Sequence, residues 1–139
     1  MNLNKFTIQK SFAISAGAGS GKTYTLSRRY INAILGFDFF REKGFDDIYY
    51  ENLKPATTKQ IVTITYTEAA ALEMKERIFG LISKILMVNS LEDKDGDKES
   101  ILEAFKALND QQKSYVNETL QQALVQSSDS KISTIHSFC

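Results

Sequence analysis

Apolar and polar residues follow two different rhythms along this chain. Short apolar runs rich in β-branched residues predict buried strands, and they lie at 11–15, 60–65 and 132–135. Longer segments in which apolar residues recur every three or four positions predict amphipathic helices. The resulting order of strand, helix, strand, helices and strand predicts an α/β fold, in which a parallel sheet is joined by helical crossovers.

The first helical segment is expected from about Lys22 to Leu35, with Gly36 as its stop. The residues that share one face of this segment are Leu26, Tyr30, Ala33, Ile34 and Phe37. The following stretch, 37–59, is expected to be irregular, because it mixes aromatic with charged residues and contains the only proline, Pro55.

The second helical segment is expected to begin at Thr67 or Glu68 and to continue to about Val88. Its apolar stripe consists of Ala70 or Ala71, Met74, Ile78, Leu81 or Ile82, and Ile85. Glu73 and Arg77 have the spacing of a surface ion pair on this helix. A polar loop is expected over 89–100. Two more helices follow, marked by Ile101, Leu102, Phe105 and Leu108 and by Val116, Leu120, Ala123 and Leu124.

Composition changes this picture mainly by excluding classes of protein. The 139 residues suffice for one domain, and 42% apolar with 24% charged residues is near the average of globular proteins. Lys and Arg together number 17, as do Asp and Glu, so the formal net charge is zero. The chain therefore lacks the excess positive charge of a protein that coats nucleic acid. The single cysteine, Cys139, favours a cytoplasmic location. No apolar stretch approaches the roughly 18 residues of a membrane span, so no membrane partner is expected.

A glycine-rich loop carries the clearest chemistry. It reads Ala-Gly-Ala-Gly-Ser-Gly-Lys-Thr at 16–23, between the first expected strand and the first expected helix. Glycines let backbone N–H groups turn inward around phosphate oxygens, and the helix that follows presents its own N–H groups. Lys22 is expected to reach the β- and γ-phosphates, and Thr23 to ligate Mg²⁺. The pattern therefore predicts a nucleoside triphosphate with Mg²⁺, and the candidate residues are Ala16, Gly17, Ala18, Gly19, Ser20, Gly21, Lys22, Thr23 and Tyr24.

Polar and aromatic residues also follow the other two expected strands. They are Tyr66, Thr67 and Glu68 after the second strand, and His136, Ser137 and Phe138 after the third. Because ligands of open parallel sheets gather at the carboxyl ends of the strands, these residues are expected near the loop. Rings and hydroxyls of this kind stack bases and bond phosphates of single-stranded nucleic acid. Taken alone, an aromatic residue at a strand end is more often part of the packing.

Three segments together resemble superfamily 1 helicases of the UvrD/RecB type. Residues 15–26 resemble motif I of these helicases, residues 62–78 resemble motif Ia, and residues 132–139, with their Thr-x-His core, resemble the DNA-contact motif that follows. The segments occur in the family order and cover essentially the whole chain. Thr-Glu-Ala-Ala at 67–70 and the position of Gln9 resemble the RecB and AddA helicase-nuclease subunits most.

The resemblance implies that residues 1–139 form the N-terminal part of a RecA-like P-loop motor domain, with a helical insertion at about 80–130. It implies that Gln9 bonds adenine, and that Lys22 and Thr23 act in catalysis on ATP and Mg²⁺. The resemblance also implies which residues contact single-stranded DNA: Thr65, Tyr66, Thr67, Thr134, His136 and Phe138. The implied activity is ATP-driven 3′–5′ translocation on DNA during recombinational repair of double-strand breaks. The implied partners are DNA ends and a second helicase-nuclease subunit.

The resemblance also indicates which parts of such a motor the sequence lacks. The family needs an Asp-Glu pair after a strand, for Mg²⁺ and for the attacking water, and no such dipeptide occurs here. Residues 131–139 read as a strand running into a turn, so we expect the front piece of a longer protein, without ATPase or unwinding activity of its own. Two alternatives stay open: another P-loop protein, such as a nucleotide kinase or GTPase-like switch, and a fragment that neither folds nor functions alone.

Overall fold

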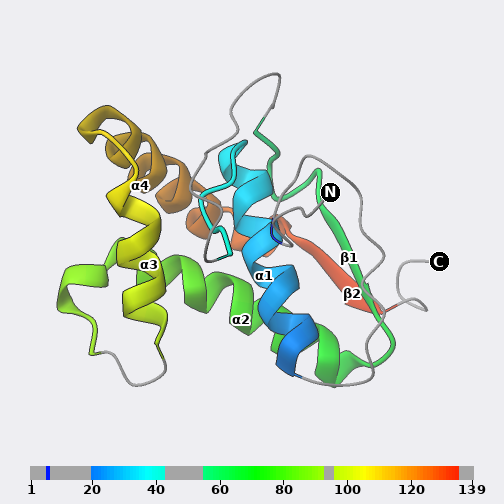
Figure 1. The fold of residues 1–139 in the computed structure, drawn as a ribbon. Helices are drawn as coiled ribbons and strands as arrows, with labels where there is room; N and C mark the ends of the chain where they lie inside the picture. Colours follow the sequence, from blue (N-terminus) through cyan, green and yellow to red (C-terminus); the bar gives the residue numbers. More distant parts are fainter. Residues whose placement is uncertain (1–5, 7–19, 43–54, 93–95, 135–139) are drawn as a thin grey trace, which may run out of the picture.

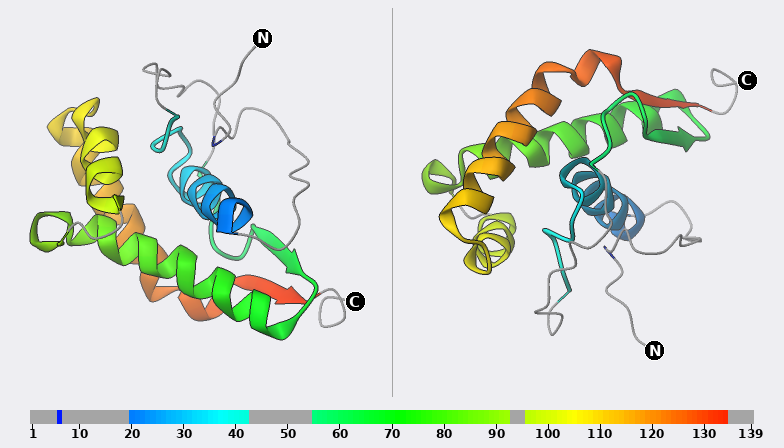
Figure 2. Two further views of the ribbon diagram at one scale, coloured as in Figure 1. Left: turned by 60° about the horizontal axis from the view of Figure 1, so that its bottom comes forward. Right: turned by 90° about the horizontal axis from the view of Figure 1, so that it is seen from above.

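The computed structural model of the chain describes Phe6 and residues 20–42, 55–92 and 96–134. In these residues the elements follow one another as α1 (Ser20–Leu35), β1 (Val62–Thr65), α2 (Glu68–Leu86), η1 (Val88–Ser90), α3 (Asp97–Lys106), α4 (Asp110–Val125), η2 (Ser127–Asp129) and β2 (Lys131–Thr134). The first expected strand, at 11–15, lies outside the described residues. Figures 1 and 2 show the two strands on one side of the molecule and α3 with the start of α4 on the other.

Strands β1 and β2 pair in parallel, as the sequence predicts. Val62 lies opposite Lys131 and Thr65 lies opposite Thr134, so both strands end together at one edge. A parallel pair needs a long crossover, and α2, α3 and α4 supply it. The α/β class is therefore confirmed. Strand β1 is shorter than predicted, because pairing begins at Val62 rather than Gln60, whereas β2 begins one residue earlier than predicted.

Helix α1 is buried on more sides than the predicted single face. Tyr30, Ile34 and Phe37 are buried as expected, whereas Leu26 is only partly buried. Ile31 and Leu35 are also buried, although they lie outside the predicted face. The physical reason is that α2 and α4 both pack on α1. The helix ends at Gly36 as predicted, with φ at 79°.

The segment that follows Gly36 has no regular secondary structure, but it belongs to the core. Phe37, Phe39 and Phe40 are only 3%, 0% and 2% exposed. The Phe39 ring lies 5.0 Å from the Phe40 ring and 5.1 Å from the Phe105 ring of α3, edge-on in both cases. Such pairs add about 1 kcal/mol each beyond the burial of their area. The aromatic segment therefore joins the end of α1 to α3.

The apolar stripes of the other helices are confirmed with one exception. Helix α2 buries Ala71, Met74, Ile78, Phe79, Leu81, Ile82 and Ile85. Ile101, Leu108, Val116, Leu120 and Ala123 are buried in the α3–α4 region. Leu102 is 43% exposed, because α3 turns its Ile101 side inward. Helix α3 begins at Asp97, so the polar loop predicted over 89–100 is shorter than expected.

One buried amide, that of Asn32, connects α1 to the chain around it. Its side chain is fully buried, and Nδ2 donates hydrogen bonds to the backbone oxygens of Phe6 (2.9 Å) and Phe40 (3.0 Å). The Phe40 N–H donates to Asn32 Oδ1 at 2.9 Å. Buried backbone groups need such partners, so Asn32 determines where the aromatic segment can lie.

Replacing this amide should destabilise the protein. We expect Asn32→Ala to lower the free energy of unfolding by about 3 kcal/mol, because three buried backbone groups would lose their partner. Urea denaturation measures the difference. The matched control is Asn89→Ala at an exposed position of η1, which should change stability by less than about 0.5 kcal/mol. Equal effects of the two substitutions would contradict the assignment.

Candidate nucleotide and nucleic-acid site

The described part of the glycine-rich loop forms the first turn of α1. Ser20, Gly21, Lys22 and Thr23 are the first residues of this helix, and the side chains of Lys22 and Thr23 are partly exposed. The N–H groups of a first helical turn have no acceptor within the helix, and the positive end of the helix dipole favours anions. The turn therefore has the local geometry that the loop pattern predicts for phosphate binding.

Lys22 and Thr23 carry the polar side chains of the first turn of α1 that matter most for phosphate binding. In the parts of the chain that the structure describes, no hydrogen bond or ion pair engages the Lys22 ammonium or the Thr23 hydroxyl. Thr25, by contrast, donates its hydroxyl to the Gly21 carbonyl of the same helix at 3.0 Å. A lysine and a threonine at the start of a helix, both without a partner among the described residues, are available to a bound anion and its counter-ion.

A magnesium ion would fit the Thr23 hydroxyl. Among the described residues no group of three or more His, Cys, Asp or Glu gathers around one point. Mg²⁺ bound to a nucleotide does not require such a group, because phosphate oxygens and waters supply most of its ligands. A threonine hydroxyl is a hard oxygen donor, and Thr23 stands in the first turn of α1, where the phosphates of a nucleotide would lie.

The carboxyl ends of β1 and β2 bring a second set of predicted residues together. Thr65 lies opposite Thr134 in the register of the sheet. The Thr65 hydroxyl lies 3.1 Å from the carbonyl oxygen of Thr67 and 3.4 Å from that of Ser133, so it links both strand ends. The sequence expectation that these two segments meet at one edge of the sheet is confirmed for the described residues.

Tyr66 is strongly exposed at this edge. Its side chain is 84% exposed, and it follows Val62 and Ile64, 46% and 47% exposed, along the same side of β1. An exposed aromatic ring has a face for stacking on a base. Tyr66 is therefore the one described residue of the edge whose position suits stacking directly.

Thr67 and Thr134 have structural roles at this edge. Thr67 is the N-cap of α2, and its hydroxyl accepts a hydrogen bond from the Ala70 N–H at 3.0 Å. Thr134 is only 4% exposed, and its hydroxyl donates to Oε1 of Glu68 at 3.4 Å. Thr134 is therefore buried at this edge, and its predicted contact with DNA stays a prediction. The sequence placed Glu68 after the second expected strand, but it did not predict the hydrogen bond that Glu68 accepts from Thr134.

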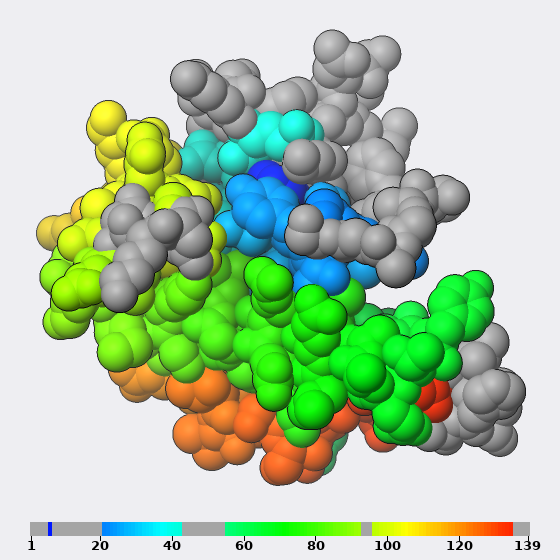
Figure 3. Space-filling model, turned by 90° about the horizontal axis from the view of Figure 1, so that it is seen from below, coloured from blue at the N-terminus to red at the C-terminus, as the bar shows by residue number. Residues whose placement is uncertain are grey.

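The first turn of α1 and the strand ends lie toward the same side of the molecule (Figures 1 and 2). Seen from below, α2 lies between them, and atoms of α1 adjoin atoms of α2 on the surface (Figure 3). Gln9, Ala16, Gly17, Ala18, Gly19, His136 and Phe138 lie outside the described residues. The structure therefore brings together Thr65, Tyr66, Thr67 and Thr134, and it places Ser20 to Tyr24 at the start of α1.

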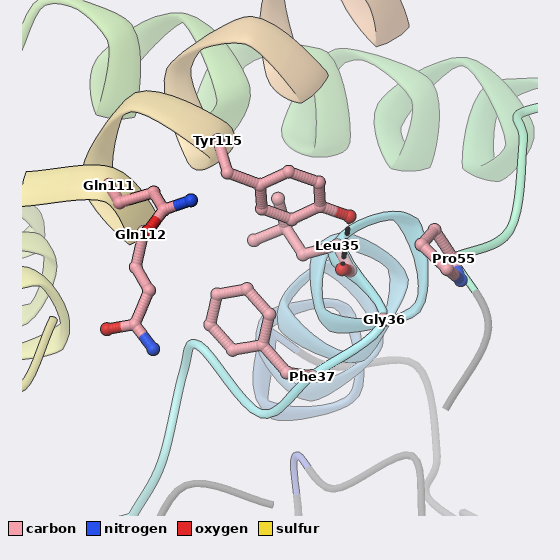
Figure 4. Close-up of a pocket in the computed structure, with 7 residues that line it drawn as sticks. All are labelled: Leu35, Gly36, Phe37, Pro55, Gln111, Gln112 and Tyr115. Carbon is pink, nitrogen blue, oxygen red and sulfur yellow. Dashed lines mark hydrogen bonds between the residues drawn. The ribbon is translucent and has the colours of Figure 1, made fainter. Parts of the chain in front are cut away.

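A cavity lies at the opposite end of α1. It has a volume of about 390 Å³, and its lining residues are Leu35, Gly36, Phe37, Pro55, Gln111, Gln112 and Tyr115 (Figure 4). The Tyr115 hydroxyl donates a hydrogen bond to the Leu35 carbonyl at 2.8 Å beside it. The rise of a helix puts Leu35 about 22 Å from the first turn of α1. This cavity is therefore separate from the predicted nucleotide site.

Burial changes the titration of two neighbours on α1. It raises the pKa of Tyr30 to about 12, because the phenolate would lose its hydration. The Tyr30 hydroxyl has no hydrogen-bond partner in the described part of the chain. Burial lowers the pKa of Arg29, and the nearby Asp38 opposes that shift. Both residues serve the packing of α1 and stand apart from its first turn.

The helices of the described segments include none with the length and apolar character that a membrane crossing requires.

Comparison with known proteins identifies relatives over almost the whole chain. Residues 3–139 match the family described as UvrD/REP helicase N-terminal domain. The chain is 34% identical over 134 residues to an ATP-dependent helicase/nuclease subunit of Clostridium botulinum (strain Hall), and the match covers 96% of this chain and 7% of the relative. The protein of the same name from Clostridium kluyveri is 27% identical, with 96% of this chain and 8% of the relative covered. The chain thus spans less than a tenth of the length of these relatives.

The cap of α2 supports a prediction about the sheet edge. We expect Thr67→Ala to lower the free energy of unfolding by about 1 kcal/mol, because the Ala70 N–H would lose its acceptor. Thr67→Ser, which keeps the hydroxyl, should stay near the unsubstituted chain. Thermal unfolding of the two variants separates the outcomes, and equal melting temperatures would show that the cap contributes nothing.

Proposed function

The chain belongs to the UvrD/REP helicase N-terminal domain family, and from that membership we propose that it supplies the ATP-binding part of a DNA helicase motor. In this proposal, residues 1–139 are the N-terminal part of a RecA-like P-loop domain, and α3 and α4 belong to a helical insertion at about 80–130. The relatives are named ATP-dependent helicase/nuclease subunits, and this name supports the use of ATP.

The observation that carries the ATP-binding role is the first turn of α1. Lys22 and Thr23 stand there without a hydrogen bond or ion pair inside the described fold. We propose that the Lys22 ammonium neutralises the β- and γ-phosphates and that the Thr23 hydroxyl ligates Mg²⁺, which offsets phosphate charge during transfer. The residues proposed around the nucleotide are Gln9 for adenine, Tyr24 beside the first turn of α1, and, around the phosphates, Ala16, Gly17, Ala18, Gly19, Ser20 and Gly21.

The DNA-binding role is supported by the strand ends. Tyr66 is exposed beyond β1, and the hydroxyl-bearing residues Thr65 and Thr67 flank it. We propose that Tyr66 stacks on a base of single-stranded DNA and that the Thr67 hydroxyl, which accepts from the Ala70 N–H, donates its proton to a phosphate. Thr65 would hold the edge in place, because its hydroxyl donates to backbone oxygens of both strand ends. His136 and Phe138, which follow β2 in the sequence, are proposed to complete the surface, and the buried Thr134 would support it from within through its bond to Glu68.

The whole-protein role proposed here is broader than this chain. The longer protein would couple ATP hydrolysis to 3′–5′ translocation on single-stranded DNA during repair of double-strand breaks, with DNA ends and a partner helicase-nuclease subunit. A cytoplasmic location agrees with the single cysteine. The sequence has no Asp-Glu pair for Mg²⁺ and the attacking water, so we propose that this chain binds ATP without turning it over.

Nucleotide titration tests the ATP-binding proposal. We expect the chain to bind Mg²⁺-ATP and the Lys22→Ala variant to bind it at least about tenfold more weakly, because the phosphates would lose a direct cation. Lys106→Ala, at an exposed position of α3, is the matched control and should bind as the unsubstituted chain does. A strong preference for GTP would favour another P-loop protein. Rapid ATP turnover that depends on Lys22 would contradict the proposed lack of hydrolysis.

Titration with a fluorescent oligo-dT tests the proposed DNA surface. We expect Tyr66→Ala to weaken binding about tenfold at low salt, since base stacking on an aromatic ring is lost, while the free energy of unfolding stays the same. Tyr66→Phe should retain binding. Leu72→Ala, at a 59% exposed position of α2, controls for loss of exposed apolar surface. Unchanged affinity of Tyr66→Ala would remove this residue from the DNA surface.

A further inference from the structure

Arg28 is a buried cation that lies between two aromatic rings. It is 4% exposed, and it stands one helical turn after Tyr24 on α1. Its guanidinium carbon lies 3.5 Å from the centroid of the Tyr24 ring and 5.2 Å from that of Phe40. A guanidinium stacks on aromatic faces at such distances. The Arg28 side chain therefore limits the positions that the Tyr24 ring can take.

The position of Arg28 depends in turn on α3. Nη2 of Arg28 pairs with Oδ1 of Asp97 at 3.1 Å, and Oδ2 of the same carboxylate accepts from the Lys84 ammonium at 2.6 Å. Asp97 is the first residue of α3. A buried guanidinium needs a counter-charge, because removal of the partner leaves a charge without compensation. The carboxylate of Asp97 thus holds Arg28 against Tyr24 from a distant part of the sequence.

Within the described residues, the other two nitrogens of the Arg28 guanidinium make few hydrogen bonds that would fix its orientation. Nη1 donates to the Tyr24 carbonyl at a long 3.4 Å. Nε is buried and has no hydrogen-bond partner in the described part of the chain. The ion pair with Asp97 and the two rings are therefore the contacts that orient this guanidinium.

Tyr24 connects this arrangement to the candidate nucleotide site. It directly follows Thr23 in the first turns of α1, and it remains 45% exposed. The face of an aromatic ring stacks on a planar base or a ribose, and this stacking does not involve the triphosphate. The contribution of Tyr24 to binding should therefore depend on the nucleoside.

We propose that Arg28 is a positioning residue for nucleoside recognition: held by Asp97 of α3, it keeps the Tyr24 ring beside the first turn of α1. The inference rests on the proposed ATP binding and deepens it, because it makes nucleotide affinity depend on the docking of α3 against α1. Since such coupling is reciprocal, a bound nucleotide should also stabilise that docking.

Calorimetric titrations with Mg²⁺-ATP and with Mg²⁺-tripolyphosphate test the proposal on the whole chain. Arg28→Gln, Asp97→Asn and Tyr24→Ala should each weaken ATP binding about five- to tenfold and leave tripolyphosphate binding within about twofold. Arg28→Lys keeps the charge but loses the planar stack, so it should lie between. The double variant of Arg28→Gln and Asp97→Asn should bind ATP no more weakly than the worse single variant.

The matched control is Arg77→Gln. Arg77 pairs with Glu73 at 3.9 Å on α2, and both side chains are about 60% exposed, so this substitution should leave both affinities unchanged. Should Arg28→Gln fail to fold in a thermal melt, Tyr24→Ala and Asp97→Asn carry the test.

The possible failures differ from one another. ATP binding that is unchanged in the Asp97 and Arg28 variants overturns the positioning role and leaves the proposed function intact. Parallel loss of ATP and tripolyphosphate also overturns it, because the phosphates would then be affected rather than the nucleoside. An unsubstituted chain that binds neither ligand overturns the proposed function, and the inference that rests on it.

Discussion

Helix α1 is enclosed by the rest of the fold, and this enclosure governs the structure. Helices α2 and α4 pack on it, and the aromatic segment after Gly36 folds back against it. Enclosure makes an unpaired polar group of α1 costly, although the Tyr30 hydroxyl and Nε of Arg28 have no hydrogen-bond partner among the described residues. Asn32 avoids this cost by bonding the backbone of Phe6 and Phe40, and Arg28 reduces it by pairing with Asp97. In the described residues, the first turn of the helix differs, because Lys22 and Thr23 keep their polar side chains uncommitted there.

The sheet edge is built by the same requirement for hydrogen-bond partners. The N–H groups at the start of α2 need acceptors, and Thr67 provides one while the chain leaves β1. Glu68, in the next position, accepts from Thr134 at the end of β2. The strand ends are therefore joined to each other and to α2. Tyr66, between these anchored residues, remains exposed. A rigid frame around an exposed ring is suited to holding a base at a defined place.

Family membership and geometry bear on different questions. The match over residues 3–139 establishes the family, and the position of Lys22 and Thr23 supplies a physical reason for phosphate binding. This chain covers only 7% and 8% of the relatives and contains no Asp-Glu dipeptide, so a complete catalytic cycle is a proposal for the longer protein. The described fold thus supplies a basis for the proposed recognition of ATP and DNA, whereas hydrolysis and translocation are properties proposed for the longer protein.

Local sequence patterns were enough to predict the helices, the strand segments and the position of Lys22 and Thr23 at the start of α1, because each of these depends on neighbouring residues. The parallel pairing followed from the order of strands and helices along the chain. The sequence pattern also predicted Gly36 as the end of α1 and Thr67 as a start of α2. It did not predict that Phe39 and Phe40 are buried, since their order has no helical or strand spacing. Nor did it predict the pairs of Arg28 with Asp97 and of Thr134 with Glu68, which join residues 69 and 66 positions apart. Only the packing of α2, α3 and α4 around α1 decides such contacts. The reason is that the folded chain brings these distant residues together, and a buried charged or polar group then pairs with the group that lies beside it.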